Sequence, residues 1–108
     1  MTLSLPNHHL EMVLAIIRAH PEVERAVVYG SRARGDNRPY SDIDLTLSGN
    51  GLTQRALSEI AEALEESALP YFVDLSDFAA ISNDRLRTII EREGVEIYRT
   101  TPETSPSR

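Results

Sequence analysis

Hydrophobic positions along the chain alternate between helix-like and strand-like spacing. Four apolar residues at helical spacing predict a first helix over residues 7–19, with Asn7 as its N-cap and Pro21 as its stop: Leu10, Val13, Leu14 and Ile17. The short β-branched run from Arg25 to Tyr29 then predicts a buried strand that ends at Gly30. Residues 32–35 are expected to form a single helical turn.

A second strand is predicted over residues 42–48, because apolar and polar residues alternate there without a break. Its buried face carries Ile43, Leu45 and Leu47, and its polar face carries Asp42, Asp44, Thr46 and Ser48. A second amphipathic helix is expected to follow, with its apolar positions from Leu57 to Ala68 and its end at Pro70.

The remaining pattern predicts a strand over residues 71–75, a helix capped by Ser82 or Asn83 and stopped by Gly94, and a final strand over residues 95–99. Helices and strands therefore alternate, which indicates an α+β or α/β fold with one sheet. We assign residues 1–99 to a single domain and expect residues 100–108 to be a disordered tail of Thr, Ser, Pro and charge. The order of the strands cannot be inferred from this pattern.

Composition narrows the classes of function. The chain has 108 residues, no cysteine and a formal net charge of −6, so disulfides and thiolate metal sites are excluded and binding to a nucleic acid backbone is disfavoured. All 11 basic residues are arginine. We expect no membrane span and no signal peptide, and therefore a cytoplasmic location.

The candidate chemistry lies in three aspartates at strand positions. Asp42 and Asp44 point to the same face of one predicted strand, with their Cα atoms about 6–7 Å apart, and Asp74 lies within a later apolar strand. Carboxylate oxygens together with substrate phosphates form the ligand set that Mg²⁺ prefers. An isolated Asp-x-Asp pair is usually just a solvated strand face, but the third aspartate and the turn described next favour a metal site.

That turn is Gly30-Ser31, which is separated from Asp42 by the ten residues from Arg32 to Ser41. Gly30 allows a sharp turn and a close approach of a phosphate to the backbone, and Ser31 adds a hydroxyl group and an N–H group. Arg32 and Arg34 follow directly, and either guanidinium could bind a phosphate, although the sequence does not say which one points inward.

These residues resemble a known family signature. Gly30-Ser31-Arg32-Ala33-Arg34-Gly35 followed by Ser41-Asp42-Ile43-Asp44-Leu45 is similar to the signature of the DNA polymerase β-type nucleotidyltransferases, in particular their minimal, antitoxin-like branch. The resemblance extends from the first helix to about Tyr98.

The resemblance implies a mixed sheet flanked by helices, ATP as the substrate and two Mg²⁺ ions as cofactors. It implies that Ser31 contacts the triphosphate, that Asp42 and Asp44 hold the two metal ions, and that Asp74 binds the catalytic metal and helps to activate the acceptor hydroxyl. Asp77 is a weaker candidate for this third position, because we place it in a loop after the strand.

Members of this branch resemble antitoxins that bind HEPN-family ribonuclease toxins and transfer AMP to a toxin tyrosine. Our leading hypothesis is therefore a protein adenylyltransferase whose partner is a HEPN-like toxin. This domain leaves no room for a separate acceptor-binding domain, so we expect the acceptor to be, or to be held by, a second polypeptide. Two alternatives remain: a noncatalytic antitoxin that masks its partner by contact, and a small-molecule nucleotidyltransferase that works with a helical partner subunit.

Other polar and aromatic residues carry weaker signals. His8, His9 and His20 lack zinc-site spacing and are expected to be exposed to solvent. The four tyrosines are expected to be core or edge aromatics, although Tyr40, beside the aspartate pair, could contact the nucleotide or be a target of self-modification.

Overall fold

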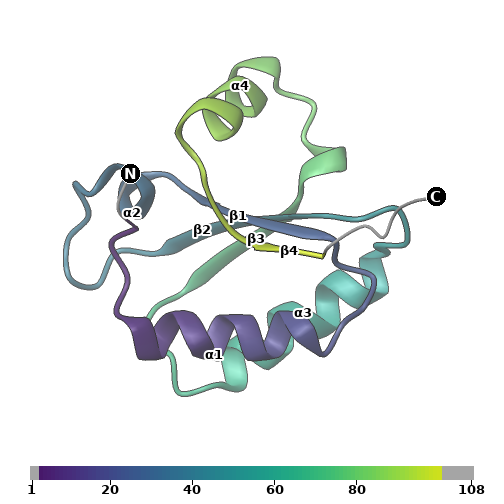
Figure 1. The fold of residues 1–108 in the computed structure, drawn as a ribbon, viewed down its shortest axis with the longest axis horizontal. Helices are drawn as coiled ribbons and strands as arrows, with labels where there is room; N and C mark the ends of the chain where they lie inside the picture. Colours follow the sequence, from purple (N-terminus) through teal and green to yellow (C-terminus); the bar gives the residue numbers. More distant parts are fainter. Residues whose placement is uncertain (1–2, 101–108) are drawn as a thin grey trace.

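The computed structural model describes residues 3–100 and contains one sheet between two unequal helical layers (Figure 1). The elements follow the order α1 (Asn7–Arg18), β1 (Arg25–Tyr29), α2 (Ser31–Arg34), β2 (Ile43–Ser48), α3 (Gln54–Glu66), β3 (Val73–Asp77), the 3₁₀ turn η1 (Phe78–Ala80), α4 (Asp84–Glu93) and β4 (Val95–Arg99). This confirms the predicted α+β class. Residues 101–108, which make up nearly all of the predicted tail, lie outside the described residues.

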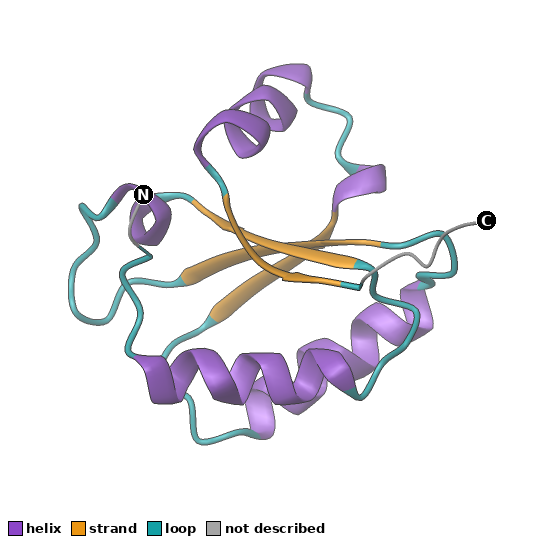
Figure 2. Ribbon diagram, viewed as in Figure 1, coloured by secondary structure: helices purple, strands orange, loops and turns teal. Residues whose placement is uncertain are grey.

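The four strands are arranged in the order β3-β2-β1-β4. β1 pairs antiparallel with both β2 and β4, whereas β2 and β3 are parallel, so the sheet is mixed. The long helices α1 and α3 cover one face of this sheet, and α4 and η1 lie on the other face (Figure 2). The parallel pair requires a crossover connection, which α3 supplies.

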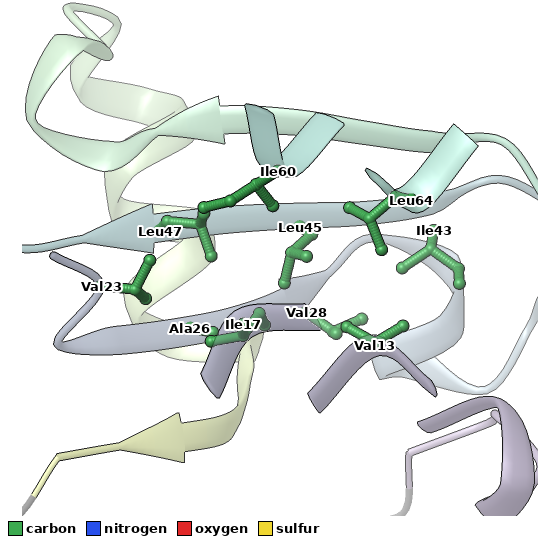
Figure 3. Packing of buried hydrophobic residues seen from close by; sticks show 10 residues of the cluster. All are labelled: Val13, Ile17, Val23, Ala26, Val28, Ile43, Leu45, Leu47, Ile60 and Leu64. Carbon is green, nitrogen blue, oxygen red and sulfur yellow. The ribbon is translucent and has the colours of Figure 1, made fainter. Parts of the chain in front are cut away.

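The core lies between the sheet and the layer formed by α1 and α3. Alternate residues of β1 and β2 point into it, and they meet one apolar stripe from each long helix (Figure 3). The cluster consists of Val13, Ile17, Val23, Ala26, Val28, Ile43, Leu45, Leu47, Ile60 and Leu64. Because strand side chains alternate between faces, this burial fixes Tyr29 and Asp44 on the opposite face of the sheet.

Several predicted boundaries need correction. Helix α1 begins at Asn7, so the N-cap residue is Pro6, which offers no side-chain cap, and Asn7 occupies the first helical position instead. Helix α3 is capped by Thr53, whose hydroxyl accepts a hydrogen bond from the Ala56 N–H at 3.0 Å, and ends at Glu66, so Ala68 lies beyond it. Asn83 caps α4, as one of the two predicted candidates.

Strand β3 starts two residues later than predicted, because its ladder with β2 begins at the pair Ile43 and Val73. It ends at Asp77, which we had placed in a loop. The polar face of β2 is also less open than expected, because Thr46 is buried and its hydroxyl donates to the Ser76 carbonyl oxygen at 3.4 Å.

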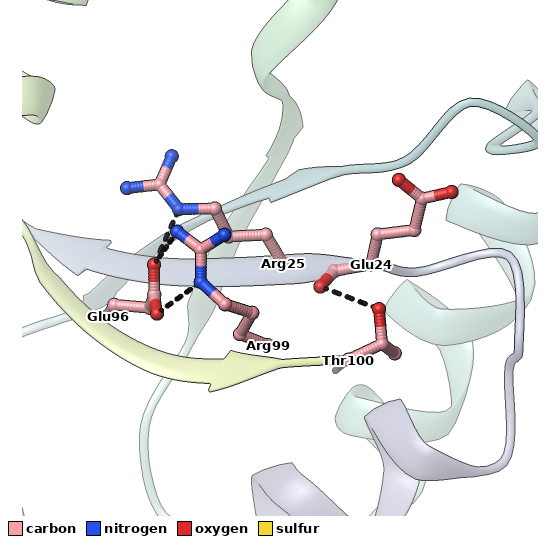
Figure 4. A network of polar contacts seen from close by, with 5 residues as sticks. All are labelled: Glu24, Arg25, Glu96, Arg99 and Thr100. Carbon is pink, nitrogen blue, oxygen red and sulfur yellow. Dashed lines mark hydrogen bonds and ion pairs between the residues drawn. The ribbon is translucent and has the colours of Figure 1, made fainter. Parts of the chain in front are cut away.

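A network of ion pairs connects the other edge of the sheet. Glu96 on β4 accepts hydrogen bonds from Arg25 on β1 at 2.7 Å and from Arg99 on its own strand at 2.8 and 2.9 Å (Figure 4). These bonds lower the pKa of Glu96 to about 2, with Arg99 as the largest cause and Arg25 as the second. The network joins β4 to β1 through side chains as well as through the backbone.

Candidate active site

The two central carboxylates face each other across neighbouring strands. Asp44 on β2 is in register with Asp74 on β3, and Tyr29 on β1 is in register with Asp44 on its other side. Neighbouring strands lie about 4.8 Å apart, so the three side chains form one row across the face of the sheet opposite the core. The parallel pairing of β2 and β3 therefore brings Asp44 and Asp74 together.

Asp42 lies just before β2, two residues from Asp44, and its side chain is exposed. The alternation of the strand places it on the same face as Asp44. Its charge contributes to the raised pKa of the Asp44 carboxyl, which is consistent with close spacing of the two groups.

Asp44 has a raised pKa for identifiable reasons. Partial burial is the largest cause, the charges of Asp74 and Asp42 raise the pKa further, and Arg34 opposes them. A carboxylate crowded by two like charges at a half-buried position is stabilised in its ionised form by a cation. The electrostatics of this site therefore favour the binding of positive charge.

The turn after β1 approaches this carboxylate closely. Gly30 has φ = 78°, and a Cβ atom at this position would overlap the Asp44 carboxylate. Both the backbone conformation and the space thus require glycine. Ser31 follows as the first residue of α2, directly after the turn that approaches Asp44.

The two arginines of α2 have different environments. Arg32 is only 2% exposed, and its guanidinium donates hydrogen bonds to the carbonyl oxygens of Ser4 (2.8 Å), Pro39 (3.2 Å) and Ser41 (2.9 and 3.1 Å). It also lies 4.2 Å from the centre of the Tyr71 ring. The expected phosphate contact does not match this position, because the donors of Arg32 already hold the loop that leads to the aspartates.

Arg34 is exposed and remains available to a ligand. It forms ion pairs with Asp36 at 3.2 Å and with Glu93 on α4 at 3.7 Å, and its charge reaches Asp44. A surface ion pair of this kind is weak and exchanges readily for a phosphate. Of the two predicted cations, Arg34 is therefore the one whose guanidinium is exposed on the side of Asp44.

Asp77 is on the wrong face to serve as the third carboxylate. It is in register with Leu47, whose side chain points into the core, and its own carboxylate accepts a hydrogen bond from the Ala79 N–H at 3.0 Å. Asp77 therefore caps η1. The alternative third position does not fit, and Asp74 is left as the neighbour of Asp44.

Tyr29 is a site residue that we had expected only to fill the core or a sheet edge. Burial raises the pKa of its hydroxyl, the nearby Ser76 side chain opposes this, and the charges of Asp44 and Asp74 raise it further. The sequence contained a signal for this position. Tyr29 lies directly before Gly30, and strand alternation places it on the same face as Arg25, opposite the core residues of β1.

His9 is another correction, because it is not simply exposed to solvent. Its Nδ1 atom shares a hydrogen bond with the Tyr71 hydroxyl at 2.9 Å, and the two rings pack edge to face. This contact joins the start of α1 to the segment before β3. His9 and Arg32 therefore both contact the Tyr71 side chain.

Within residues 3–100, no group of three or more His, Asp or Glu side chains converges into a formed metal site. The three aspartates are neighbours, but their carboxylates do not all face a single position that one metal ion could occupy. Their hard oxygen ligands still fit Mg²⁺, which takes only one or two carboxylates directly and completes its octahedron with phosphate oxygens and water. The donor set is thus compatible with a metal ion that arrives with a nucleotide.

No helix among these residues is both long and apolar enough to cross a membrane.

The chain matches a family model described as "Polymerase beta, Nucleotidyltransferase" over residues 11–103. It is 35% identical over 96 residues to the probable protein adenylyltransferase MntA of Haemophilus influenzae, an alignment that covers 88% of this chain and 83% of that protein.

Solved structures are similar as well. A toxin–antitoxin crystal structure with AMP-PNP matches with a TM-score of 0.70 and 26% identity, covering 84% of this chain and 73% of that one. A complex of a tri-AMPylated Shewanella oneidensis HEPN toxin with its MNT antitoxin matches with a TM-score of 0.66, covering 87% and 72% of the two chains. The second match has 23% identity and supports the fold alone.

Proposed function

This chain belongs to the polymerase beta nucleotidyltransferase family, and we propose that it transfers AMP from ATP to a hydroxyl group of a HEPN-type toxin for which it is the antitoxin. The observation that carries the proposal is the row formed by Asp44 and Asp74, with Asp42 beside it and the Gly30 turn at one end. The similarity to a protein adenylyltransferase supports AMP as the transferred group.

The site residues have separable roles in this proposal. Asp42 and Asp44 would hold two Mg²⁺ ions, and Asp74 would contribute to the one nearer the acceptor. When bound, these ions would neutralise the phosphates and favour the ionised form of the acceptor hydroxyl. Gly30 and Ser31 would hold the β- and γ-phosphates, and Arg34 would exchange its ion pair with Glu93 for a phosphate oxygen.

The chain's own residues position the reaction. The acceptor oxygen attacks the α-phosphorus, the bond from that phosphorus to the bridging oxygen of the β-phosphate breaks, and pyrophosphate leaves toward Ser31. The hydroxyl proton passes to Asp74, which lies at the opposite end of the row. Arg32 acts indirectly, because it fixes the loop that leads into Asp42.

The decisive experiment combines the purified chain, the protein encoded by the neighbouring reading frame, ATP and MgCl₂. Mass spectrometry should show the partner heavier by one or more AMP groups. Asp42→Asn and Asp44→Asn should each reduce transfer by about 100-fold or more. Asp84→Asn, at an exposed position at the start of α4, is the matched control and should transfer normally.

A tight complex whose partner never gains AMP would contradict the proposal and support the noncatalytic antitoxin. AMP transfer to a hydroxylated small molecule, with none to the protein, would instead support the small-molecule alternative. Size-exclusion chromatography of the same mixtures separates these outcomes from a simple failure to bind.

A further inference from the structure

The direction from which the acceptor must arrive follows from the order of the strands. The Gly30-Ser31 turn leaves β1, Asp44 lies on β2 and Asp74 lies on β3, which is the edge of the sheet. In-line displacement requires the attacking and leaving oxygens on opposite sides of the α-phosphorus. If pyrophosphate leaves on the β1 side, as the proposed function requires, the acceptor arrives from the side of β3.

A large exposed aromatic residue lies at that entrance. Phe72 is 68% exposed, and its carbonyl oxygen accepts a hydrogen bond from the Ile43 N–H at 2.9 Å, which places Phe72 level with Asp42. Tyr71 and Val73, on either side of it, pack against the core, so alternation directs the Phe72 ring to the same face as Asp74. The core makes no use of this ring.

The edge of β3 offers further binding groups. In a parallel ladder, alternate residues direct their backbone N–H and C=O groups to the same side. The Phe72 carbonyl group points toward β2, so the backbone groups of Val73 and Leu75 point toward the open edge. A cavity of about 300 Å³ lies between this edge and α3. Its lining includes Ala61, Leu64, Leu69, Val73 and Leu75.

We infer that Phe72 is the residue that positions the acceptor, and that the acceptor lies in an extended segment of the partner laid along the edge of β3. The acceptor residue itself is the tyrosine that the family resemblance implies. Alternate side chains of such a segment point to opposite faces. The tyrosine would then stack on Phe72 with its hydroxyl toward Asp74, and an adjacent apolar residue would fill the cavity beside Leu64.

An aromatic hydroxyl fits this position better than an aliphatic one. Stacking of two rings adds to the buried apolar area and holds the acceptor ring in one orientation, whereas serine or threonine would leave the Phe72 ring uncovered. The tyrosine Oη forms the new bond to the α-phosphorus, pyrophosphate departs, and the phenolic proton passes to Asp74. No further reactant is needed.

The test uses the full chain with its partner protein and measures initial rates while each substrate is varied. Phe72→Ala should raise the KM for the partner about tenfold and leave the KM for ATP unchanged. Tyr40→Ala is the matched control, because Tyr40 is also an exposed aromatic, at 81%, but precedes β2 instead of lying at the β3 edge. It should leave the KM for the partner unchanged, because a contact of Tyr40 with the nucleotide would change the KM for ATP alone.

A second variant tests the cavity independently. Ala61→Trp would fill the cavity from an exposed position on α3, so it should raise the KM for the partner without changing the melting temperature. Exchange of the modified tyrosine in the partner for serine should abolish transfer at that position.

The possible failures are distinguishable, although this inference rests on the proposed function. A wild-type chain that transfers AMP, together with a Phe72→Ala variant whose KM for the partner is unchanged, would overturn the acceptor assignment alone. A change in the KM for ATP equal to that for the partner would also overturn it, because Phe72 would then serve the nucleotide. A wild-type chain that transfers nothing would overturn both.

Discussion

The Asp44 carboxylate occupies the space that a Cβ atom at Gly30 would need. The turn that we assign to phosphate binding and the central carboxylate are thus packed against each other, and neither can shift without the other. This contact connects the turn after β1 to β2, and these two strands pair antiparallel. It also provides a direct way to perturb the site without removing any functional group.

Gly30→Ala should reduce AMP transfer by about 100-fold, because displacement of Asp44 by about 1 Å misplaces a metal ligand. Gly35→Ala is the matched control: Gly35 also has a positive φ, of 88°, but an added Cβ there meets nothing within 4 Å. Gly35→Ala should lose about 1–2 kcal/mol of stability from backbone strain, and Gly30→Ala should lose more, because its Cβ atom also overlaps Asp44. Urea unfolding and transfer rates check the two effects, and equal loss of activity in both variants would show that strain alone matters.

Asp44→Asn should reduce transfer by about 100-fold or more and yet stabilise the fold at neutral pH. The folded state raises the pKa of Asp44, so ionisation of this group disfavours folding. This cost grows as the pH rises from the ordinary pKa of aspartate to the raised pKa, and it is complete above the raised pKa. Below the ordinary pKa of aspartate, the group is protonated in both states and the difference disappears. Melting curves should therefore show a higher Tm for the variant at pH 7 than for the wild type, and equal values near pH 3.

Asp74→Asn and Asp77→Asn should have opposite effects. Asp74 is the register partner of Asp44, so its loss should reduce transfer by about 100-fold with little change in stability. Asp77 is in register with the core residue Leu47 and caps η1, so its loss should cost about 1 kcal/mol of stability and leave most activity. Transfer rates and urea unfolding of both variants decide the assignment. A larger loss of activity in Asp77→Asn than in Asp74→Asn would make Asp77 the third carboxylate.

Much of this arrangement follows from the sequence. Strands β1 and β4 have their predicted bounds, because short segments rich in apolar and β-branched residues lie between residues that favour turns. The face shared by Asp42 and Asp44 follows from alternation with Ile43 and Leu45. The adjacency of Asp44 and Asp74 depended on strand order, which local patterns do not encode.

The residues that sequence reasoning misplaced are those whose roles depend on distant segments. Arg32 is buried because carbonyl groups from Ser4, Pro39 and Ser41 converge on it after the loop closes. Its neighbour Arg34 has the same chemistry and the opposite environment. A local pattern cannot separate two arginines of one helical turn, because only the folded loop supplies the acceptors.

This difference between the arginines leads to another prediction. Arg32→Met should destabilise the chain by about 2–3 kcal/mol, because it leaves backbone carbonyl groups of the loop without their donors. Arg34→Met should leave the urea midpoint nearly unchanged and raise the KM for ATP. A stable Arg32→Met variant with weakened ATP binding would restore Arg32 as a phosphate ligand.

The ion pairs of Glu96 should make stability depend on pH at the far edge of the sheet. The lowered pKa of Glu96, about 2, means that its charge stabilises the fold above the usual pKa of 4.5 and that this contribution is lost as the pH falls through about 2. Because the group is partly exposed, Glu96→Gln should cost only about 1 kcal/mol at pH 7. The difference should shrink as the pH approaches 2, and Glu62→Gln, at an exposed position on α3, is the control.

The parallel ladder between β2 and β3 has a consequence for how this enzyme can be assayed. A slip of β3 by a single position would exchange its two faces, turning Asp74 inward and exposing Val73 and Leu75, while the overall content of helix and sheet would hardly change. Circular dichroism would be blind to such an error. The rate of AMP transfer would reveal it, because molecules with the slipped strand would lack Asp74 at the site. The specific activity of a preparation therefore reports the fraction of molecules in which β3 has the correct register with β2.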